Sequence, residues 1–542
     1  MASVDYIIVG GGIGGCVVAS RLHQKYPSAS LLLIEAGPDV SKHPMIVNST
    51  PTPMLQHSEL DWDYKTTPQK HLGNKICFGA AGKALGGGSA INACGWVRGD
   101  RIDYDAWGKQ VGDARWSYSG ILPYFRKTEN HHTPYANPKE HGFEGPIYTS
   151  SVTSSGRNYP LRDMVKAAWE AIGLEQIPDA NSGSPQGFAD LNENRRNGKR
   201  QLATDAYPLD GIKVMTGTLV KRVIVKQNSG RRVATAVELA SGVVLTARKE
   251  IIISAGAYRT PQVLMLSGIG DSADLKKHGI EQVVDLPEVG KNLHDHLGIP
   301  QRWKLRHPEK GYSLGSPLFN DPAFAFGSPL DFVATQTVPI SGLKAALEKD
   351  EGAVTESHPL LQPPRSHLEA YIIYVGANKE DPAIAMDGSH IATRVVGLLP
   401  SSRGSVTLAS SDPADDPIID PKYYATEADR YVIRTGLKVL TKMLLETEEG
   451  RAFVESETTP AGFDPITEKT GDEEIDRRVS KVGDTLYHPA GTAAMGKVVD
   501  ADLKVYGVDG LRVVDASVIP IPIAAHYQAC VYALAEQAAD II

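Results

Sequence analysis

The sequence predicts an α/β fold in which a domain of the Rossmann type is joined to a second, α+β domain. Three observations lead to this prediction. A largely apolar run over residues 5–9 stops at a glycine cluster, and apolar residues resume at helical spacing over 16–22, which indicates a strand, a tight turn and a helix. Residues 250–256 have the pattern of a buried strand that ends at a turn. The chain has 542 residues, so two or more domains are expected.

The glycines of the first turn occupy the three fixed positions of a dinucleotide-binding fingerprint. Gly10 permits the tight turn, Gly12 lets the backbone approach a pyrophosphate, and Gly15 allows close packing of the helix on the strand. A second strand is predicted over residues 31–34, and Glu35 follows it directly. An acid at this distance from the glycines binds ribose hydroxyls and repels a 2′-phosphate. The motif suits both NAD and FAD, and its place at the start of a long chain favours FAD.

The composition argues against several classes of protein. A net charge of −8 and a pI of about 6.1 argue against nucleic acid and anionic membrane surfaces as partners. The first predicted strand starts too early to leave room for a signal peptide, and no stretch is long and apolar enough to span a bilayer. We therefore expect a soluble, cytoplasmic protein. Four cysteines lack metal-ligand spacing and are expected to be free thiols in a reducing compartment: Cys16, Cys77, Cys94 and Cys530.

Residues 82–99 contain a second glycine cluster followed by small residues. From physics alone, this segment is either a surface loop or a backbone laid against a flat or phosphorylated ligand. It resembles the first signature of the glucose-methanol-choline (GMC) family of flavin oxidoreductases, and residues 256–270 fit the second signature at every restricted position. Residues 289–296, 402–405 and the C-terminal segment also resemble family landmarks, in the family's order. The resemblance covers the whole chain and extends to aryl-alcohol or hydroxymethylfurfural oxidase-like and choline dehydrogenase-like members.

The resemblance implies an FAD-binding domain and a substrate domain whose antiparallel sheet is backed by helices. The FAD-binding domain would be discontinuous and comprise residues 1–155, 201–305 and 479–542. The substrate-binding domain would comprise residues 156–200 and 306–478. The hydrophobic patterns predict strands over 219–225, 234–239, 368–374 and 391–399, and helices over 164–172 and 430–445.

The resemblance also implies a set of FAD contacts. The matching positions are Gly10, Gly12, Ile13, Gly14, Gly15, Glu35, Ala36, Gly86, Gly87, Ser89, Asn92, Ala93, Cys94, Gly95, Val220, Asp515, Ala516, Gln528 and Ala529. Val220 would contact the adenine end of FAD through its backbone. Family members with a histidyl flavin bond carry histidine immediately before the asparagine of the first signature, where this chain has Ile91. A covalent link at that position is excluded, so non-covalent FAD is expected.

Two histidine pairs contain residue types that can bind a metal. His294 and His296 would share one face of an extended segment without Asp295 between them, and the adjacent His131 and His132 diverge. No metal site is therefore expected. An apolar entrance and an ordinary core are both open interpretations of four phenylalanines: Phe319, Phe324, Phe326 and Phe332.

The C-terminal segment carries the residues expected to perform the chemistry. His488 and His526 stand where the family keeps its active-site histidine and the histidine or asparagine that accompanies it. Oxidation of an alcohol requires removal of the hydroxyl proton, and a neutral imidazole titrates in the right range. We therefore expect His488 to be the base, and His526 to orient the alcohol and balance charge on the flavin. Tyr487, beside the base, would contact the substrate as an aromatic wall, which favours benzylic, furanic or allylic alcohols over sugars.

The resemblance implies FAD-dependent oxidation of a primary alcohol to the aldehyde by hydride transfer, with dioxygen or a quinone-type acceptor reoxidising the flavin. Two alternatives remain open. A non-redox family member, such as a hydroxynitrile lyase or a cyclase, would use the same histidines for acid–base chemistry. A flavoprotein without turnover would serve binding or assembly.

Overall fold

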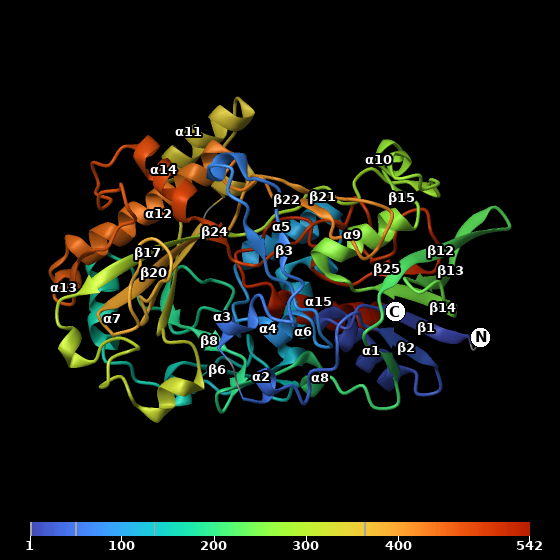
Figure 1. Cartoon of the computed structure of the whole chain (residues 1–542), viewed down its shortest axis with the longest axis horizontal. Helices are drawn as coiled ribbons and strands as arrows, with labels where there is room; N and C mark the ends of the chain where they lie inside the picture. The colour runs from blue at the N-terminus through green and yellow to red at the C-terminus, as the bar shows by residue number, and fades with distance from the viewer. Residues whose placement is uncertain (1–2, 49–50, 135, 363–364) are drawn as a thin grey trace.

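The computed structural model describes residues 3–48, 51–134, 136–362 and 365–542 and has a mixed α/β fold (Figure 1). Residues 1 and 2, which belong to the start of the chain where no signal peptide is expected, lie outside the described residues. Two seven-stranded sheets lie toward opposite ends of the molecule, and both chain ends marked in Figure 1 lie on the side of the first sheet. The predicted combination of an α/β and an α+β domain is confirmed.

The first sheet has the strand order β11-β2-β1-β14-β13-β12, and β25 also pairs with β14. Strands β11, β2, β1, β14 and β25 run parallel, whereas β12 and β13 add an antiparallel hairpin. The buried residues of β1, β2 and β14 are apolar at residues 7–9, 31–34 and 251–253, as expected where both faces of a sheet are covered. The strands are β1 (Val4–Val9), β2 (Leu31–Ile34), β11 (Lys213–Met215), β12 (Val220–Asn228), β13 (Arg231–Leu239), β14 (Val244–Ile253) and β25 (Leu511–Val513).

The carboxyl ends of the parallel strands meet at one edge of this sheet, which we call the ligand edge. Gly10 follows β1, Glu35 follows β2, and Asp515 comes two residues after β25. Open α/β sheets bind their ligands outside the carboxyl ends of the strands. The topology therefore gathers the glycine turn and the C-terminal segment at a single place.

The second sheet is antiparallel, with the order β23-β17-β20-β19-β18-β7, and β24 also pairs with β17. Helix α12 (Glu427–Leu445) packs on one face through buried Ile433, Leu437 and Leu440. The strands are β7 (Gly187–Asp190), β17 (Leu297–Leu305), β18 (Phe332–Gln336), β19 (Leu368–Ile373), β20 (His390–Gly397), β23 (Val454–Glu457) and β24 (Asp484–Thr485).

Helix α1 (Ile13–Lys25) near the start of the chain packs against helix α15 (Gln528–Ile541) at its end. An ion pair of 2.6 Å between Arg21 and the buried Glu536 connects them. Other helices of ten or more residues are α5 (Arg101–Val111), α6 (Tyr118–Thr128), α7 (Arg162–Ala171), α9 (Gly256–Leu266), α11 (Ile340–Glu351) and α14 (Asp472–Val482).

The elements predicted from hydrophobic patterns are confirmed. The predicted strands appear as β1, β2, β12, β13, β14, β19 and β20, and the predicted helices as α1, α7 and α12. Strand β17 begins at Leu297, although the sequence division placed residues up to 305 with the FAD-binding segments. It joins the second sheet because its residues 297–304 pair with β20, which no local pattern indicates. The domain limits stay a prediction.

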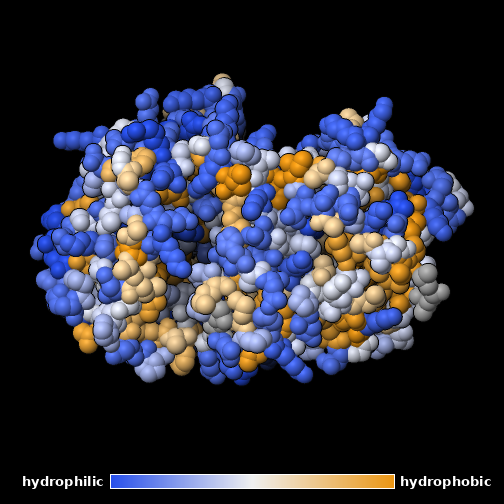
Figure 2. All heavy atoms as spheres, in the orientation of Figure 1, coloured by the Kyte–Doolittle hydropathy of each residue, from blue (hydrophilic) through white to orange (hydrophobic). Residues whose placement is uncertain are grey.

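Hydrophilic residues cover most of the face drawn in Figure 2, and hydrophobic residues form separate patches among them. Within the described residues, no helix combines the length and the apolar character that crossing a bilayer requires. The cytoplasmic location stays a prediction. All four cysteines are buried and free, as predicted.

Candidate active site

A cavity of about 480 Å³ lies between the ligand edge of the first sheet and the second sheet. Gly10, Gly12 and Glu35 line one part of it, and His488 and His526 line another. Its lining is mostly apolar, with a small number of polar groups. This is the usual form of a cofactor or substrate site.

The glycine turn shapes the part of the cavity beside β1. Gly10 has a φ of +98°, and a Cβ there would stand 2.4 Å from the carbonyl oxygen of Ser254. A Cβ on Gly12 would meet no atom of the described residues closer than 3.8 Å, so a side chain there would project into the cavity. Helix α1 begins at Ile13 without a side-chain N-cap, which leaves its first N–H groups for an anion. The turn therefore fits the pyrophosphate of FAD.

Glu35 is buried at the end of β2, where it lines the cavity. Its two carboxylate oxygens accept hydrogen bonds from the N–H groups of Gly11 and Gly37, both at 2.7 Å. Burial raises the pKa of Glu35 to about 7, although these two bonds act in the opposite direction. Each carboxylate oxygen has a second acceptor site, so Glu35 can hold the turn and bind ribose hydroxyls together.

Most of the predicted FAD contacts line this cavity. They are Gly10, Gly12, Ile13, Gly14, Glu35, Ala36, Gly87, Asn92, Ala93, Cys94, Gly95, Val220, Asp515, Ala516 and Gln528. The other four lie behind the lining. Gly15 packs against the Gly10 backbone, the N–H of Gly86 donates to Gly11, Ser89 donates to the carbonyl of Gly86 at 2.7 Å, and Ala529 is buried in α15. Contact of all these residues with FAD stays a prediction.

Gln528 joins the C-terminal helix to the segment of the first signature. Its side-chain N–H donates to the carbonyl of Gly95 at 2.6 Å, and its oxygen accepts from the side chain of Asn92 at 3.0 Å. The backbone N–H of His526 donates to the carbonyl of Val97 at 3.2 Å. These bonds between distant parts of the chain place His526 at the cavity.

Asp295 positions the backbone around His488. Its buried carboxylate accepts from the N–H groups of His488 at 2.7 Å and His296 at 2.8 Å, and from the hydroxyl of Thr485 at 2.6 Å. Burial raises the pKa of Asp295 to about 6 against the effect of these bonds. Tyr487 has a φ of +64°, an uncommon conformation for a residue other than glycine, and its N–H donates to Thr485 at 2.8 Å. This strained turn brings both Tyr487 and His488 to the cavity.

His526 lies beside His488, with 5.0 Å between the ring centroids. Its Nε2 lies 2.9 Å from a carboxylate oxygen of Glu369, which is buried on β19. A carboxylate only accepts hydrogen bonds, so Nε2 of His526 carries a proton and Nδ1 is the second polar atom of the ring. A Cβ on Gly95 would stand 3.0 Å from Nδ1, so this glycine keeps the space beside that atom open.

Hydrogen bonds assign the tautomers of three further histidines. A carbonyl only accepts, so Nε2 of His294, 3.3 Å from the oxygen of Ile519, carries the proton, and Nδ1 accepts from the hydroxyl of Tyr527 at 3.4 Å. The Tyr527 oxygen then accepts from Nε2 of His296 at 3.5 Å. The unprotonated Nδ1 of His296 accepts from Nδ1 of His488 at 3.1 Å. The tautomer of His488 that is consistent with this network has its proton on Nδ1 and a lone pair on Nε2.

Burial keeps these rings neutral. It lowers the pKa of His296 to about 3 and the pKa of His294 well below its usual range. Burial and the neighbouring imidazoles lower the pKa of His488 in the same direction. His488 is therefore neutral at pH 7 and has a lone pair for a proton, but its lowered pKa makes it a weaker base than the ordinary imidazole expected from the sequence.

Sequence reasoning missed Asp295, His296, Glu369 and Tyr527 as members of this site. The spacing of His294 and His296 is a signal in the sequence, but it suggests metal ligands, whereas the two rings bond to Tyr527. Glu369 had no local signal, because a single acid in a predicted strand usually faces solvent.

The four phenylalanines do not line the cavity. Phe319 and Phe324 pack on each other and on Tyr159, with 4.5 Å and 4.7 Å between the closest ring centroids. Phe332 packs on Phe188 in the second sheet. Phe319 and Phe332 are buried and Phe324 is partly buried against the same core, so the core interpretation holds for these three, and the described residues that line this cavity include none of the four.

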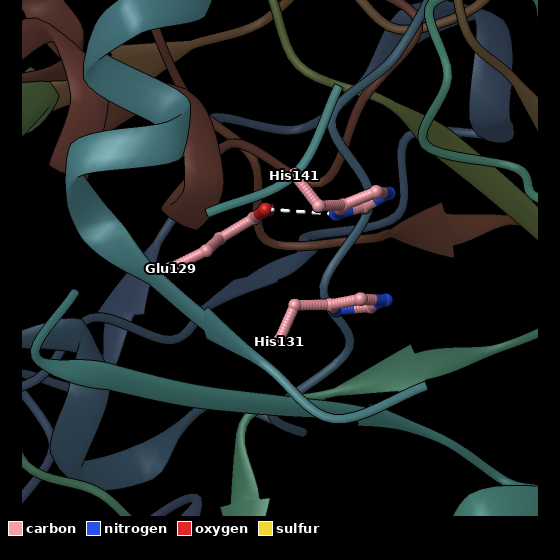
Figure 3. A group of neighbouring side chains, drawn as sticks. All are labelled: Glu129, His131 and His141. Carbon is pink, nitrogen blue, oxygen red and sulfur yellow. Dashed lines mark hydrogen bonds and ion pairs between the residues drawn. The ribbon is translucent and has the colours of Figure 1, made fainter. Parts of the chain in front are cut away.

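A second buried group, Glu129, His131 and His141, was not predicted from the sequence (Figure 3). One ligand-type atom from each lies within 4.8 Å of the others. The two imidazole rings are stacked, with 4.0 Å between centroids and 15° between planes, and Figure 3 shows them parallel. A single ion cannot lie in both ring planes, so the geometry disfavours a metal site.

This second group is an ionic cluster centred on His141. Its Nδ1 donates to Glu129 and its Nε2 to Asp179, both at 2.9 Å. Burial opposes a charge on this ring, but the two carboxylates outweigh that effect and raise the pKa of His141 to about 9. Buried Arg98 also pairs with Glu129, at 3.3 Å. His141 is therefore a buried cation that holds two acids together.

Comparison with known proteins finds relatives along the whole chain. A family model described as GMC oxidoreductase matches residues 4–298, and a second one of the same description matches residues 400–535. The chain is 43% identical over 540 residues to GMC-type oxidoreductase acuG of Aspergillus aculeatus, which covers 99% of this chain and 98% of that protein. It is 33% identical over 556 residues to an alcohol dehydrogenase (acceptor) of Pseudomonas putida, covering 99% and 95%. The crystal structure of pyridoxine 4-oxidase from Mesorbium loti has a TM-score of 0.85 at 28% identity, covering 99% of both chains.

Proposed function

The chain belongs to the GMC oxidoreductase family and is an FAD-dependent oxidoreductase, and from this premise we propose that it oxidises a primary alcohol to the aldehyde. Aromatic, furanic or allylic alcohols are the proposed substrates, and dioxygen or a quinone-type compound is the proposed electron acceptor. The observation that carries the proposal is the placement of His488 and His526 at a mostly apolar cavity, with 5.0 Å between their ring centroids and with Nδ1 of His488 3.1 Å from Nδ1 of His296.

His488 is the proposed base. Removal of the hydroxyl proton raises the electron density of the alcohol and prepares the carbon-bound hydrogen to leave as hydride. Nε2 of His488 accepts that proton, while its Nδ1–H stays bonded to His296. Asp295 holds the backbone of His488 in the required place. Bound FAD supplies the acceptor for the hydride.

His526 is the proposed orienting residue for the substrate oxygen. Glu369 fixes its ring through Nε2, which leaves Nδ1 as the atom that meets the substrate. The charge of Glu369 also balances positive charge that builds up on the two imidazoles when the proton is transferred. Glu369 acts through His526 and is therefore a positioning residue.

Tyr487 is the proposed aromatic wall of the substrate site. It lines the cavity next to His488, and Phe78 packs against it edge to face, with 6.0 Å between ring centroids. A flat substrate is stabilised by stacking on such a ring. This supports aromatic or furanic alcohols over sugars.

Anaerobic mixing of the FAD-loaded enzyme with a panel of alcohols tests the proposal. A substrate should bleach the flavin, and admission of dioxygen should restore the colour if the enzyme is an oxidase. His488→Ala should retain FAD and slow flavin reduction by about 10²- to 10⁴-fold, the usual contribution of a general base. His526→Asn should slow it less, because asparagine can still bond to the substrate oxygen. Product formation without bleaching would instead indicate a non-redox member of the family.

A further inference from the structure

The second sheet presents two hydrogen-bond donors to the cavity. Arg394 on β20 and Tyr371 on β19 are cross-strand partners, and both line the cavity. Within the described residues, neither the guanidinium of Arg394 nor the hydroxyl of Tyr371 has a hydrogen-bond or ion-pair partner. Burial raises the pKa of Tyr371 to about 12, so its hydroxyl keeps the proton that it can donate.

Arg394 lies on the substrate side of the cavity. A Cβ on Gly298 would stand 3.1 Å from Cδ of Arg394 and 3.5 Å from the side chain of Leu486. Leu486 begins the turn that carries Tyr487 and His488. The guanidinium therefore belongs to the part of the cavity beside the proposed base, on the opposite sheet from the glycine turn that fits a pyrophosphate.

The geometry of β19 sets the distance between Tyr371 and the groups proposed to react with the alcohol. Glu369, which holds His526, comes two residues before Tyr371 on β19, so their side chains share one face of the sheet. Two residues of a strand span about 7 Å. A ligand group bound by Tyr371 and Arg394 would thus lie one strand repeat from the group that orients the alcohol.

Arg302 adds a second positive charge to this face. Arg394 pairs with Pro300 on β17, and Arg302 is two residues further along that strand. Burial and the charge of Arg394 lower the pKa of Arg302 to about 10, and its Nε is buried without a hydrogen-bond partner among the described residues. Lys304, the next residue on this face, is paired with Glu455 at 3.1 Å. Arg302 and Arg394 therefore lie close together on one face of the sheet. Among the described residues, no carboxylate bonds to either guanidinium.

We propose that the substrate alcohol carries a carboxylate, which Arg394 and Tyr371 bind while its hydroxyl lies at His488 and His526. This inference rests on the proposed alcohol oxidation and names its substrate class. A guanidinium matches the geometry of a carboxylate, and the phenol adds a third donor. The charge of Arg302 strengthens the attraction without contact. A single aromatic or furan ring that carries the hydroxymethyl and carboxylate groups at opposite ends fits this arrangement.

Two matched alcohols test the proposal, 4-(hydroxymethyl)benzoate and 4-(hydroxymethyl)benzamide, which differ in the charge of the remote group. The ratio of their kcat/KM values is measured for the FAD-loaded enzyme, Arg394→Met, Arg394→Lys and Arg306→Met. Arg306 is exposed and bonds to the carbonyl of Arg451, so it serves as the matched control. We expect the enzyme to prefer the carboxylate by about 10- to 150-fold, the range of a charge-assisted hydrogen bond. Arg394→Met should abolish this preference, Arg394→Lys should keep part of it, and Arg306→Met should keep all of it.

Binding provides a second measurement that does not need turnover. Benzoate should change the FAD absorption spectrum at a lower concentration than benzamide, and Arg394→Met should remove this difference. Equal binding and oxidation of the charged and neutral compounds, or a preference that survives Arg394→Met, would overturn the inference. If no alcohol bleaches the flavin but benzoate still binds through Arg394, the anion site stands and the proposed alcohol oxidation is wrong.

Discussion

Replacing His296 with phenylalanine tests whether this residue sets the tautomer of the proposed base. The Nδ1 atoms of His296 and His488 are 3.1 Å apart, and burial keeps both rings neutral, so one proton lies between them. The bonds that begin at the carbonyl of Ile519 place this proton on His488. Phenylalanine keeps a ring of similar size but cannot accept the hydrogen bond.

The expected loss of rate follows from the Nδ1–H of His488, which is left without a hydrogen-bond acceptor in His296→Phe. A buried N–H that loses its acceptor costs about 1–3 kcal/mol. His488→Ala, by comparison, removes the base and should cost about 10²- to 10⁴-fold. In His296→Phe, the form of His488 with an unprotonated Nε2 becomes less favourable by about 1–3 kcal/mol, so flavin reduction should slow by about 5- to 150-fold. Because the pKa of His296 is about 3, the loss should be the same at pH 6 and pH 8.

The assay is anaerobic stopped-flow reduction of the flavin by an active alcohol, compared at equal FAD content. A double-mutant cycle supplies the control: if His296 acts through His488, His296→Phe should have no further effect when His488 is already alanine. A wild-type rate in His296→Phe would refute the tautomer assignment. An equal loss in the presence and absence of His488 would show that His296 acts by another route.

Three further predictions concern the cofactor and stability. Glu35→Gln should weaken FAD binding by about 10- to 150-fold, because a charge-assisted bond to ribose is worth about 1.5–3 kcal/mol. Titration of FAD fluorescence measures the Kd for FAD, and an unchanged Kd would contradict this role of Glu35. Acid precipitation should release all the yellow colour into the supernatant, since Ile91 stands where a histidyl bond would form; colour in the pellet would reveal another attachment. The pKa of His141 rises from 6.5 to about 9 on folding, so its stabilising effect, about 3 kcal/mol, is complete below pH 6.5 and is lost as the pH rises through 9. Thermal melts should therefore fall more steeply from pH 6.5 to 9.5 in the natural protein than in His141→Gln, and parallel curves would exclude this role.

The nucleotide-binding part of the molecule could be predicted from the sequence because its signals are local. Gly10 must adopt a positive φ, and Glu35 must follow the second parallel strand at a set distance from the turn. The buried parts of β1, β2 and β14 are continuous apolar runs over residues 7–9, 31–34 and 251–253, which makes them visible in the sequence. The structure confirms these elements and brings Gly12 and Glu35 to one cavity.

The surroundings of the proposed catalytic histidines could not be predicted in this way. His296 and His488 are 192 positions apart, and they meet because Leu297 on β17 pairs with Thr485 on β24. Strand pairing depends on the packing of the whole sheet, and a strand's own residues do not say which distant strand it will join. The ionic cluster of His141 depends in the same way on distant partners.

The sequence by itself therefore determined the fold class, the fingerprint and the positions of His488 and His526, because these depend on short-range backbone requirements and on recognisable signatures. Only the tertiary structure decided which groups surround the two histidines and which of the side chains have partners. Glu369 and Arg394 show the difference: both lie on the same antiparallel sheet, but one is bonded to His526 and the other has no bonded acid among the described residues. Their roles follow from strand register and burial, which arise only when the two sheets pack around the cavity.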